Sequence, residues 1–119
     1  MEKKLQDAEL KVMNVIWREG KTTAKHIADV LKEETGWNVN TTYTLLKRCI
    51  EKGAVERTEP HFTCRALIAK EEVQREETDR LIDKVFDGSA AGLFAALLGR
   101  KKLTENEIAQ LRALIDELE

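Results

Sequence analysis

The sequence predicts a mainly α-helical protein with a small two-stranded β-ribbon near its middle. Apolar residues recur at helical spacing in three segments before residue 53, and a glycine follows each segment. The period changes to the alternation of a strand over residues 54–68 and returns to helical from residue 70 onwards. We therefore predict an N-terminal domain over residues 1–69 and a C-terminal helical region over residues 70–119.

Length and composition limit the class of protein. At 119 residues, with 42% hydrophobic and 35% charged residues, the chain can form one domain, or a small domain with an appendage, around a thin helical core. It has no apolar run of about 20 residues, and its first residues lack the apolar segment of a secretory signal. Its two cysteines, Cys49 and Cys64, do not make a disulfide framework. These features predict a cytoplasmic protein that does not enter the membrane.

Two amphipathic helices are expected first. One spans about residues 6–19 and ends at Gly20. The other begins after the capping pair Thr22 and Thr23 and ends at Gly36. Their apolar positions are Leu10, Met13, Ile16 and Trp17 in the first, and Ala24, Ile27, Ala28 and Leu31 in the second.

The third helix is expected over residues 38–53, "NVNTTYTLLKRCIEKG", with Asn38 or Asn40 as its N-cap and Gly53 as its terminator. After it, "AVERTEPHFTCRALI" contains the chain's single proline, Pro60, between two β-prone runs. An isolated hairpin is only marginally stable, so this ribbon should pack on the three helices. The expected apolar positions are Val39, Leu45, Leu46, Cys49 and Ile50 in the helix, and Val55, Phe62, Cys64 and Ala66 in the ribbon.

The C-terminal region contains three further helical segments. Residues 70–87 are amphipathic with a strongly charged face, residues 89–99 are almost all apolar or small, and the last segment begins with a capping box at Thr104 and Glu107. Three such helices cannot cover themselves, so we expect either a second copy of the chain or the N-terminal helices to cover them, and we favour a homodimer. The expected dimerisation residues are Leu81, Val85, Phe86, Leu93, Leu97, Ile108, Leu111, Ile115 and Leu118.

One face of the third helix carries the side chains expected of a DNA contact. No carboxylate occurs from Asn38 to Ile50, although the chain has 22 acidic and 20 basic residues. Amide and hydroxyl groups come first and cations follow; such groups bond base edges and phosphates, where a carboxylate would be repelled. The candidate DNA-binding residues are Asn40, Thr41, Tyr43, Thr44, Lys47 and Arg48, together with Arg57, His61 and Arg65 of the ribbon.

Two other interpretations of this helix stay open. A solvated helix face usually mixes Glu with Lys at i, i+4, which the stretch before Glu51 does not. A domain that binds another protein is favoured by Glu51, Glu56 and Glu59, which lie near the candidate face.

The net charge differs between the two halves of the chain, since residues 1–70 have a net charge of +3 and residues 71–119 a net charge of −5. Such a division is typical of a nucleic-acid-binding half joined to a half with another partner.

The order of three helices and a ribbon is that of a winged helix-turn-helix. In addition, "LKVMNVIW", "TTAKHIADVL", "WNVNTTYTLLKR" and "EKG" occur in an order and at a spacing that resemble the penicillinase-repressor (BlaI/MecI/CopY) family. The resemblance covers most of the chain. It implies a winged helix with a C-terminal dimerisation arm, which binds a palindromic operator and represses a resistance or metal-homeostasis gene. It also implies that the candidate residues of the third helix contact DNA.

The sequence departs from that family where repression is relieved. In the β-lactamase branch a signalling protease cuts an Asn-Phe bond in the short C-terminal helix, whereas the matching positions here are Ala96 and Leu97. A signalling protease or a sensor stays open as a further partner of this chain. We still expect any such cleavage to fall within residues 89–102. The copper-responsive branch binds metal with a cysteine-rich tail, whereas this chain ends "LIDELE" without a cysteine, so we do not expect copper sensing of that type. Ligand, metal or thiol oxidation stay open as inducing signals.

No cofactor, resident metal or enzymatic activity is expected. A zinc site would have to combine His61 and Cys64 with Cys49 and His26, but both cysteines occupy inward positions and are expected to be buried. The chain has only two histidines and lacks a Gly-rich phosphate loop or a zinc-protease motif, so a nucleophile–base set is not credible. A binding protein is therefore predicted.

Overall fold

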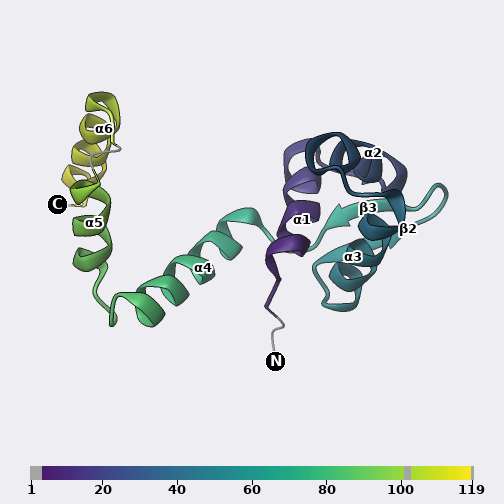
Figure 1. Ribbon diagram of the computed structural model, residues 1–119, viewed down its shortest axis with the longest axis horizontal. Coiled ribbons are helices and arrows are strands. Elements are labelled where there is room, and N and C mark those ends of the chain that lie inside the picture. The colour runs from purple at the N-terminus through teal and green to yellow at the C-terminus, as the bar shows by residue number, and fades with distance from the viewer. Residues whose placement is uncertain (1–3, 101–102, 119) are drawn as a thin grey trace. The chain divides into compact units, whose positions relative to one another are not determined.

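The computed structural model describes residues 4–100 and 103–118, within which the chain forms six helices and three short strands (Figure 1). The mainly helical class with a small sheet is confirmed. The chain divides into two compact units, the first ending at Val73 and the second beginning at Gln74. The elements are α1 (Asp7–Glu19), β1 (Thr22–Thr23), α2 (Ala24–Thr35), α3 (Val39–Glu51), β2 (Val55–Thr58), β3 (Thr63–Ala66), α4 (Lys70–Val85), α5 (Ala90–Gly99) and α6 (Glu105–Asp116).

The helix starts follow side-chain capping. Thr23 caps α2 as expected, because its hydroxyl accepts the backbone N–H of His26 at 3.1 Å. Of the two candidates for α3, Asn38 is the cap, while Asn40 lies within the helix. The start of α1 agrees with the expected helix over about residues 6–19, but its N-cap was not predicted: it is Gln6, whose backbone N–H donates to the Glu9 carboxylate at 2.8 Å.

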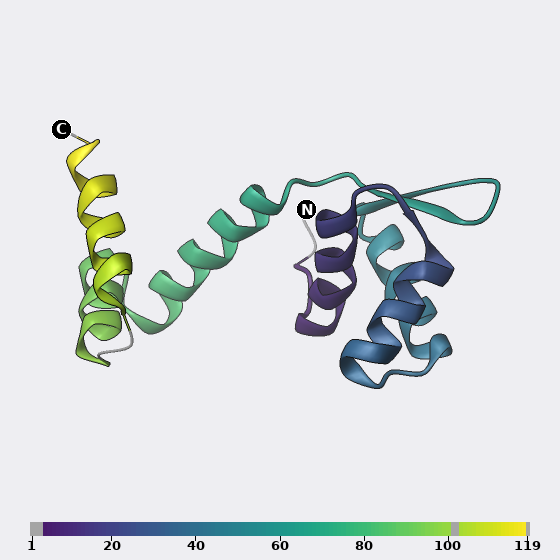
Figure 2. The same ribbon diagram turned by 90° about the horizontal axis from the view of Figure 1, so that it is seen from above.

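The sheet has one strand more than predicted. The β2–β3 hairpin is confirmed, and β1 adds to its β3 edge in the antiparallel order β1-β3-β2. Thr22 and Thr23 pair with Cys64 and Thr63, since the residue that caps a helix has extended backbone and can also bond to a neighbouring strand. Phe62 was expected within the strand but lies in the turn with a φ of 48°. The tip of the hairpin projects beyond the helices in both views (Figure 1 and Figure 2).

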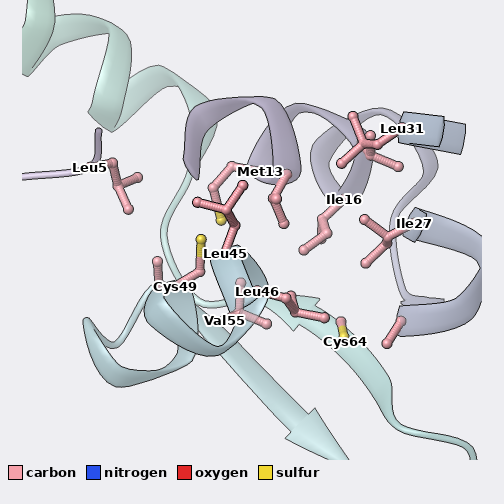
Figure 3. Packing of buried hydrophobic residues seen from close by; sticks show 14 of the residues in the cluster. Leu5, Met13, Ile16, Ile27, Leu31, Leu45, Leu46, Cys49, Val55 and Cys64 are labelled. Carbon is pink, nitrogen blue, oxygen red and sulfur yellow. The ribbon is translucent and has the colours of Figure 1, made fainter. Parts of the chain in front are cut away.

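The first unit has one hydrophobic core between α1, α2, α3 and the sheet (Figure 3). Met13, Ile16, Ile27 and Leu46 are among its largest fully buried side chains. Cys49 and Cys64 are both fully buried, as the sequence predicted. Val73 in the first turn of α4 belongs to the same cluster, and the Trp17 indole donates to the Ile68 carbonyl at 3.0 Å just before that helix begins. The segment that leads into α4 is therefore attached to the first unit.

The buried stripe of α3 differs from the expected one at two positions. Val39 is 40% exposed, because it lies in the first turn of the helix, while Thr42 is fully buried. The observed stripe is Thr42, Leu45, Leu46 and Cys49, at the i, i+3, i+4, i+7 spacing of one helix face. The Thr42 hydroxyl has no hydrogen-bond partner among the described residues.

Thr42→Val should raise the free energy of unfolding by about 1 kcal/mol, because it removes a buried hydroxyl that makes no hydrogen bond and keeps the branched shape of the side chain. Urea unfolding followed by circular dichroism would measure the change. Thr44→Val, at an exposed position of the same helix, is the matched control and should change it by less than about 0.5 kcal/mol. A Thr42→Val variant less stable than wild type would contradict the prediction.

The second unit leaves its apolar side chains open to solvent. No residue of α5 or α6 is buried within the described part of the chain. The capping box at the start of α6 is confirmed, with Thr104 and Glu107 bonded in both directions. None of the helices that the structure describes is both long and apolar enough to span a bilayer. The large apolar side chains exposed in this unit are Leu81, Val85, Phe94, Leu97, Leu98, Leu114, Ile115 and Leu118.

Candidate nucleic-acid interface

The outward face of α3 brings most of the predicted contact residues together. Burial of Leu45, Leu46 and Cys49 fixes the rotation of the helix, so the positions about half a turn away face solvent. The Thr41 side chain is partly committed to the cap, because its hydroxyl donates to the Asn38 side-chain oxygen at 3.2 Å. The exposed candidates on this face are Asn40, Thr41, Thr44, Lys47 and Arg48.

The cations at the C-terminal end of α3 have different roles. Lys47 is exposed and makes no ion pair within the described residues. Lys52, one residue past the helix, is turned into the protein, where its ammonium bonds to the Glu9 carboxylate at 2.6 Å and to the Lys4 carbonyl at 2.7 Å. Arg48 is exposed, and its charge also helps to lower the pKa of Glu9. Lys47 and Arg48 are thus the cations that α3 presents to a partner.

Tyr43 has a packing role that the sequence did not predict. It is half-buried, and its ring lies against that of Phe62 with centroids 5.8 Å apart and planes tilted by 59°. Phe62 comes from the turn of the β2–β3 hairpin, residues 55–66, which is the wing of the fold, so this contact joins α3 to the wing. We did not identify Phe62 as a site residue from the sequence, because its importance depends on a partner nineteen positions away in the chain.

The wing arginines are each paired with a carboxylate. Arg57 donates from Nε to Glu59 at 2.6 Å, and Arg65 bonds to Glu56 at 2.9 Å. Hydrogen bonding to Arg57 holds the pKa of the Glu59 carboxyl below its usual range, so this carboxylate is ionised at neutral pH. His61 is exposed at the turn, with a φ of 70°. The wing therefore presents its positive charges already close to negative ones.

The buried thiols are unsuited to bind metal. Burial raises the pKa of Cys49 to about 12 and that of Cys64 to about 11, so both are protonated at neutral pH, whereas zinc requires thiolates. His26 is bonded to Glu19 at 2.5 Å on the surface. Within residues 4–100 and 103–118, no three side chains of the metal-binding types lie together.

Three packed helices, a wing beside the third of them and an outward face on that helix that carries no carboxylate before Glu51 define a winged helix-turn-helix DNA-binding protein. Residues 5–117 match the model of the penicillinase repressor family, and the chain belongs to this family. It is a transcriptional repressor of the BlaI/MecI type, and this family is one of DNA-binding regulators, not of enzymes.

Individual relatives cover nearly the whole chain. The methicillin resistance regulatory protein MecI of Staphylococcus aureus (strain N315) is 25% identical over 115 residues, which are 95% of this chain and 94% of MecI. The penicillinase repressor of Bacillus licheniformis is 24% identical over 115 residues, 95% of this chain and 90% of that protein. The solution structure of the DNA-binding domain of the repressor BlaI matches with a TM-score of 0.54 and 31% identity, over 59% of this chain and 90% of that one.

Proposed function

We propose that two copies of this chain form a homodimer that binds an inverted-repeat operator through α3 and the wing. The observation that carries this proposal is the outward face of α3, where amide and hydroxyl groups precede Lys47 and Arg48 without an intervening acid. Amides and hydroxyls bond base edges, and cations bond guanine or phosphate. Because relatives are named for methicillin resistance and penicillinase, we infer a resistance or stress-response gene as the target and the cytoplasm as the location.

The test is a selection from a randomised duplex library at about 150 mM salt. A dimer of winged helices should enrich an inverted repeat whose half-sites are separated by whole helical turns of about 10–10.5 bp. Enrichment of a single unrepeated half-site would contradict the dimer and leave DNA recognition standing. Failure of folded protein to enrich any sequence would contradict the repressor proposal as a whole.

The exposed apolar side chains of the second unit support dimerisation. Of the nine expected dimerisation residues, Leu81, Val85, Leu97, Ile115 and Leu118 are exposed in the single chain, and Phe86, Leu93, Ile108 and Leu111 are half-buried. Exposed apolar patches of this kind mark interaction surfaces, and an identical chain is always available to cover them.

Ile115→Asp should weaken the dimer at least tenfold, because it places an unpaired carboxylate within the apolar stripe of α6. Sedimentation equilibrium would give the dimer dissociation constant. Ala113→Asp introduces the same charge two residues earlier, on the other side of the helix, and should leave that constant within about threefold of wild type. Equal effects of the two variants would place the interface elsewhere.

A second function rests on one observation. Glu56 and Glu59 pair with the wing arginines, and Glu51 is exposed at the end of α3, which suits a surface that binds a basic protein. Under this hypothesis the same domain binds a protein partner and lacks sequence-specific DNA binding. Folded, dimeric protein that enriches no duplex would favour it.

We propose that repression is relieved by cleavage within residues 89–102, as the family resemblance implies, and that a signalling protease or sensor is an additional partner. Ala96 and Leu97 are exposed in α5, whereas residues 101–102 of this range lie outside the described part of the chain. Purified protein would be incubated with extract of cells grown with or without a cell-wall antibiotic, and a fragment that ends within residues 89–102 is expected only with the antibiotic. A chain that stays intact in extract of cells whose target gene is already induced would contradict this route.

A further inference from the structure

The two arginines of the wing project from opposite faces of the sheet. Arg57 lies directly across from Cys64, and Arg65 lies directly across from Glu56. Residues directly opposite in an antiparallel pair share a face, and successive residues of a strand alternate between faces. Because Cys64 is fully buried, its partner Arg57 projects from the face that covers the helices, and Arg65 projects from the outer face.

Arg57 is held beside α3 by an aromatic contact. Its guanidinium carbon lies 3.6 Å from the centre of the Phe62 ring, and that ring packs against Tyr43 of α3. Glu59 accepts a hydrogen bond from Nε of Arg57, which restrains the orientation of the guanidinium plane. Among the described residues neither Nη group of Arg57 makes a hydrogen bond, so both remain available to donate to phosphate oxygens. The ring contact and the carboxylate thus hold the Arg57 guanidinium in a fixed orientation beside the outward face of α3, where it can donate hydrogen bonds to a DNA phosphate.

Arg65 is engaged differently. Both its Nε and one Nη donate to the same oxygen of Glu56, at 3.3 and 2.9 Å, directly across the strands. This pair lies on the face of the sheet that points away from α3. A cross-strand ion pair of this kind stabilises the register of a hairpin and offers little free charge to a partner.

We propose that Arg57 is the DNA-phosphate contact of the wing, that Phe62 is the positioning residue that holds it beside α3, and that Arg65 serves the hairpin alone. This inference rests on the proposed DNA-binding function and assigns different roles to two arginines that the sequence analysis grouped together as DNA contacts. It adds Phe62 to the residues on which operator affinity depends.

Arg57→Gln and Arg65→Gln form a matched pair, since each removes one exposed, carboxylate-paired arginine from the same hairpin. Affinity for one fixed duplex would be measured from about 50 to 200 mM salt. Arg57→Gln should lose about tenfold in affinity and reduce the salt slope by about one, whereas Arg65→Gln should stay within about twofold with an unchanged slope. Equal losses, or a larger loss for Arg65→Gln, would overturn the assignment.

The role of Phe62 is tested by non-additivity. Phe62→Leu keeps an apolar side chain but removes the aromatic face, and should lose affinity on its own but cause no further loss when combined with Arg57→Gln. Phe62→Tyr keeps the ring and should bind like wild type. Additive losses would show that Phe62 acts independently of Arg57. If the wild-type protein binds no duplex, the proposed DNA-binding function itself is overturned. If the wild type binds but Arg57→Gln and Arg65→Gln lose the same affinity, only the assignment of Arg57 is overturned.

Discussion

Replacing Lys47 and Arg48 together with alanine is expected to weaken operator binding by about 2–4 kcal/mol, roughly 30- to 1,000-fold, and to abolish selection of the inverted repeat. A bidentate base contact contributes about 1–3 kcal/mol, and each phosphate contact contributes about one to the salt slope. These are the two cations that α3 presents to solvent, since Lys52 is bonded to Glu9. Fluorescence anisotropy with the selected duplex at several salt concentrations would measure both quantities.

The control must remove the same charge elsewhere on the first unit. Lys11 of α1 and Lys32 in the last turn of α2 are exposed, and their double alanine variant has the same net charge as the test variant. It should retain selection and lose less than about threefold in affinity. If the two double variants behaved alike, the loss would reflect net charge and α3 would not be the recognition element.

Lys52→Met should lower the free energy of unfolding by about 3–5 kcal/mol. Glu9 is 1% exposed, yet it is charged, because the Lys52 ammonium lies 2.6 Å from its carboxylate and the backbone N–H of Gln6 donates to the same oxygen at 2.8 Å. Removing the cation leaves a buried carboxylate without its counter-charge. The double variant Glu9→Gln with Lys52→Met should recover part of the loss, as measured by urea unfolding.

The pH dependence of stability gives an independent test of this pair. Burial alone would raise the pKa of Glu9, but the Gln6 amide and Lys52 together hold it below its ordinary value. The pair therefore stabilises the protein above the unfolded pKa of about 4.3, and this contribution is lost as the pH falls through the lower folded pKa.

In Lys52→Met the contribution of Glu9 to stability should depend on pH in the opposite direction. With the cation gone, burial, the largest influence on Glu9, is opposed only by the Gln6 backbone N–H and the Arg48 charge, so we expect the folded pKa of Glu9 to rise above its unfolded value. Stability should then be relatively greater below about pH 4 and decline as the pH rises through the raised pKa. Unfolding measured from pH 3 to 7 would separate the two cases, with Glu9→Gln as the variant that lacks this titration. A pH profile of Lys52→Met parallel to that of wild type would contradict the role of the pair.

The sequence predicted the elements whose signals are local. The cap at Thr23, the capping box at Thr104 and the burial of both cysteines follow from patterns within a few residues, and the structure confirms them. Glu9 shows where such patterns fail. An acid within the buried face of α1 depends on Lys52, which is 43 positions away, and no local period reveals that partner.

The site was predicted in the same uneven way. The outward positions of α3 follow from helix periodicity, so Asn40, Thr44 and Lys47 are exposed as expected. Strand alternation from Val55 and from Cys64 already implies that Arg57 and Arg65 lie on opposite faces of the hairpin. The partners that give these arginines different roles, Phe62 for Arg57 and Glu56 for Arg65, depend on the register and on the turn, which the sequence does not reveal.

The contact between Tyr43 and Phe62 also makes the wing observable in solution. Tyr43 is the single tyrosine of the chain, so biosynthetic labelling with fluorotyrosine would introduce one fluorine-bearing side chain and give one ¹⁹F resonance. That fluorine would lie at the junction of α3 and the hairpin turn, where the aromatic ring of Phe62 shifts its frequency. Exchange of the wing between docked and undocked positions on the microsecond-to-millisecond timescale would broaden this one line, and binding of DNA would sharpen it.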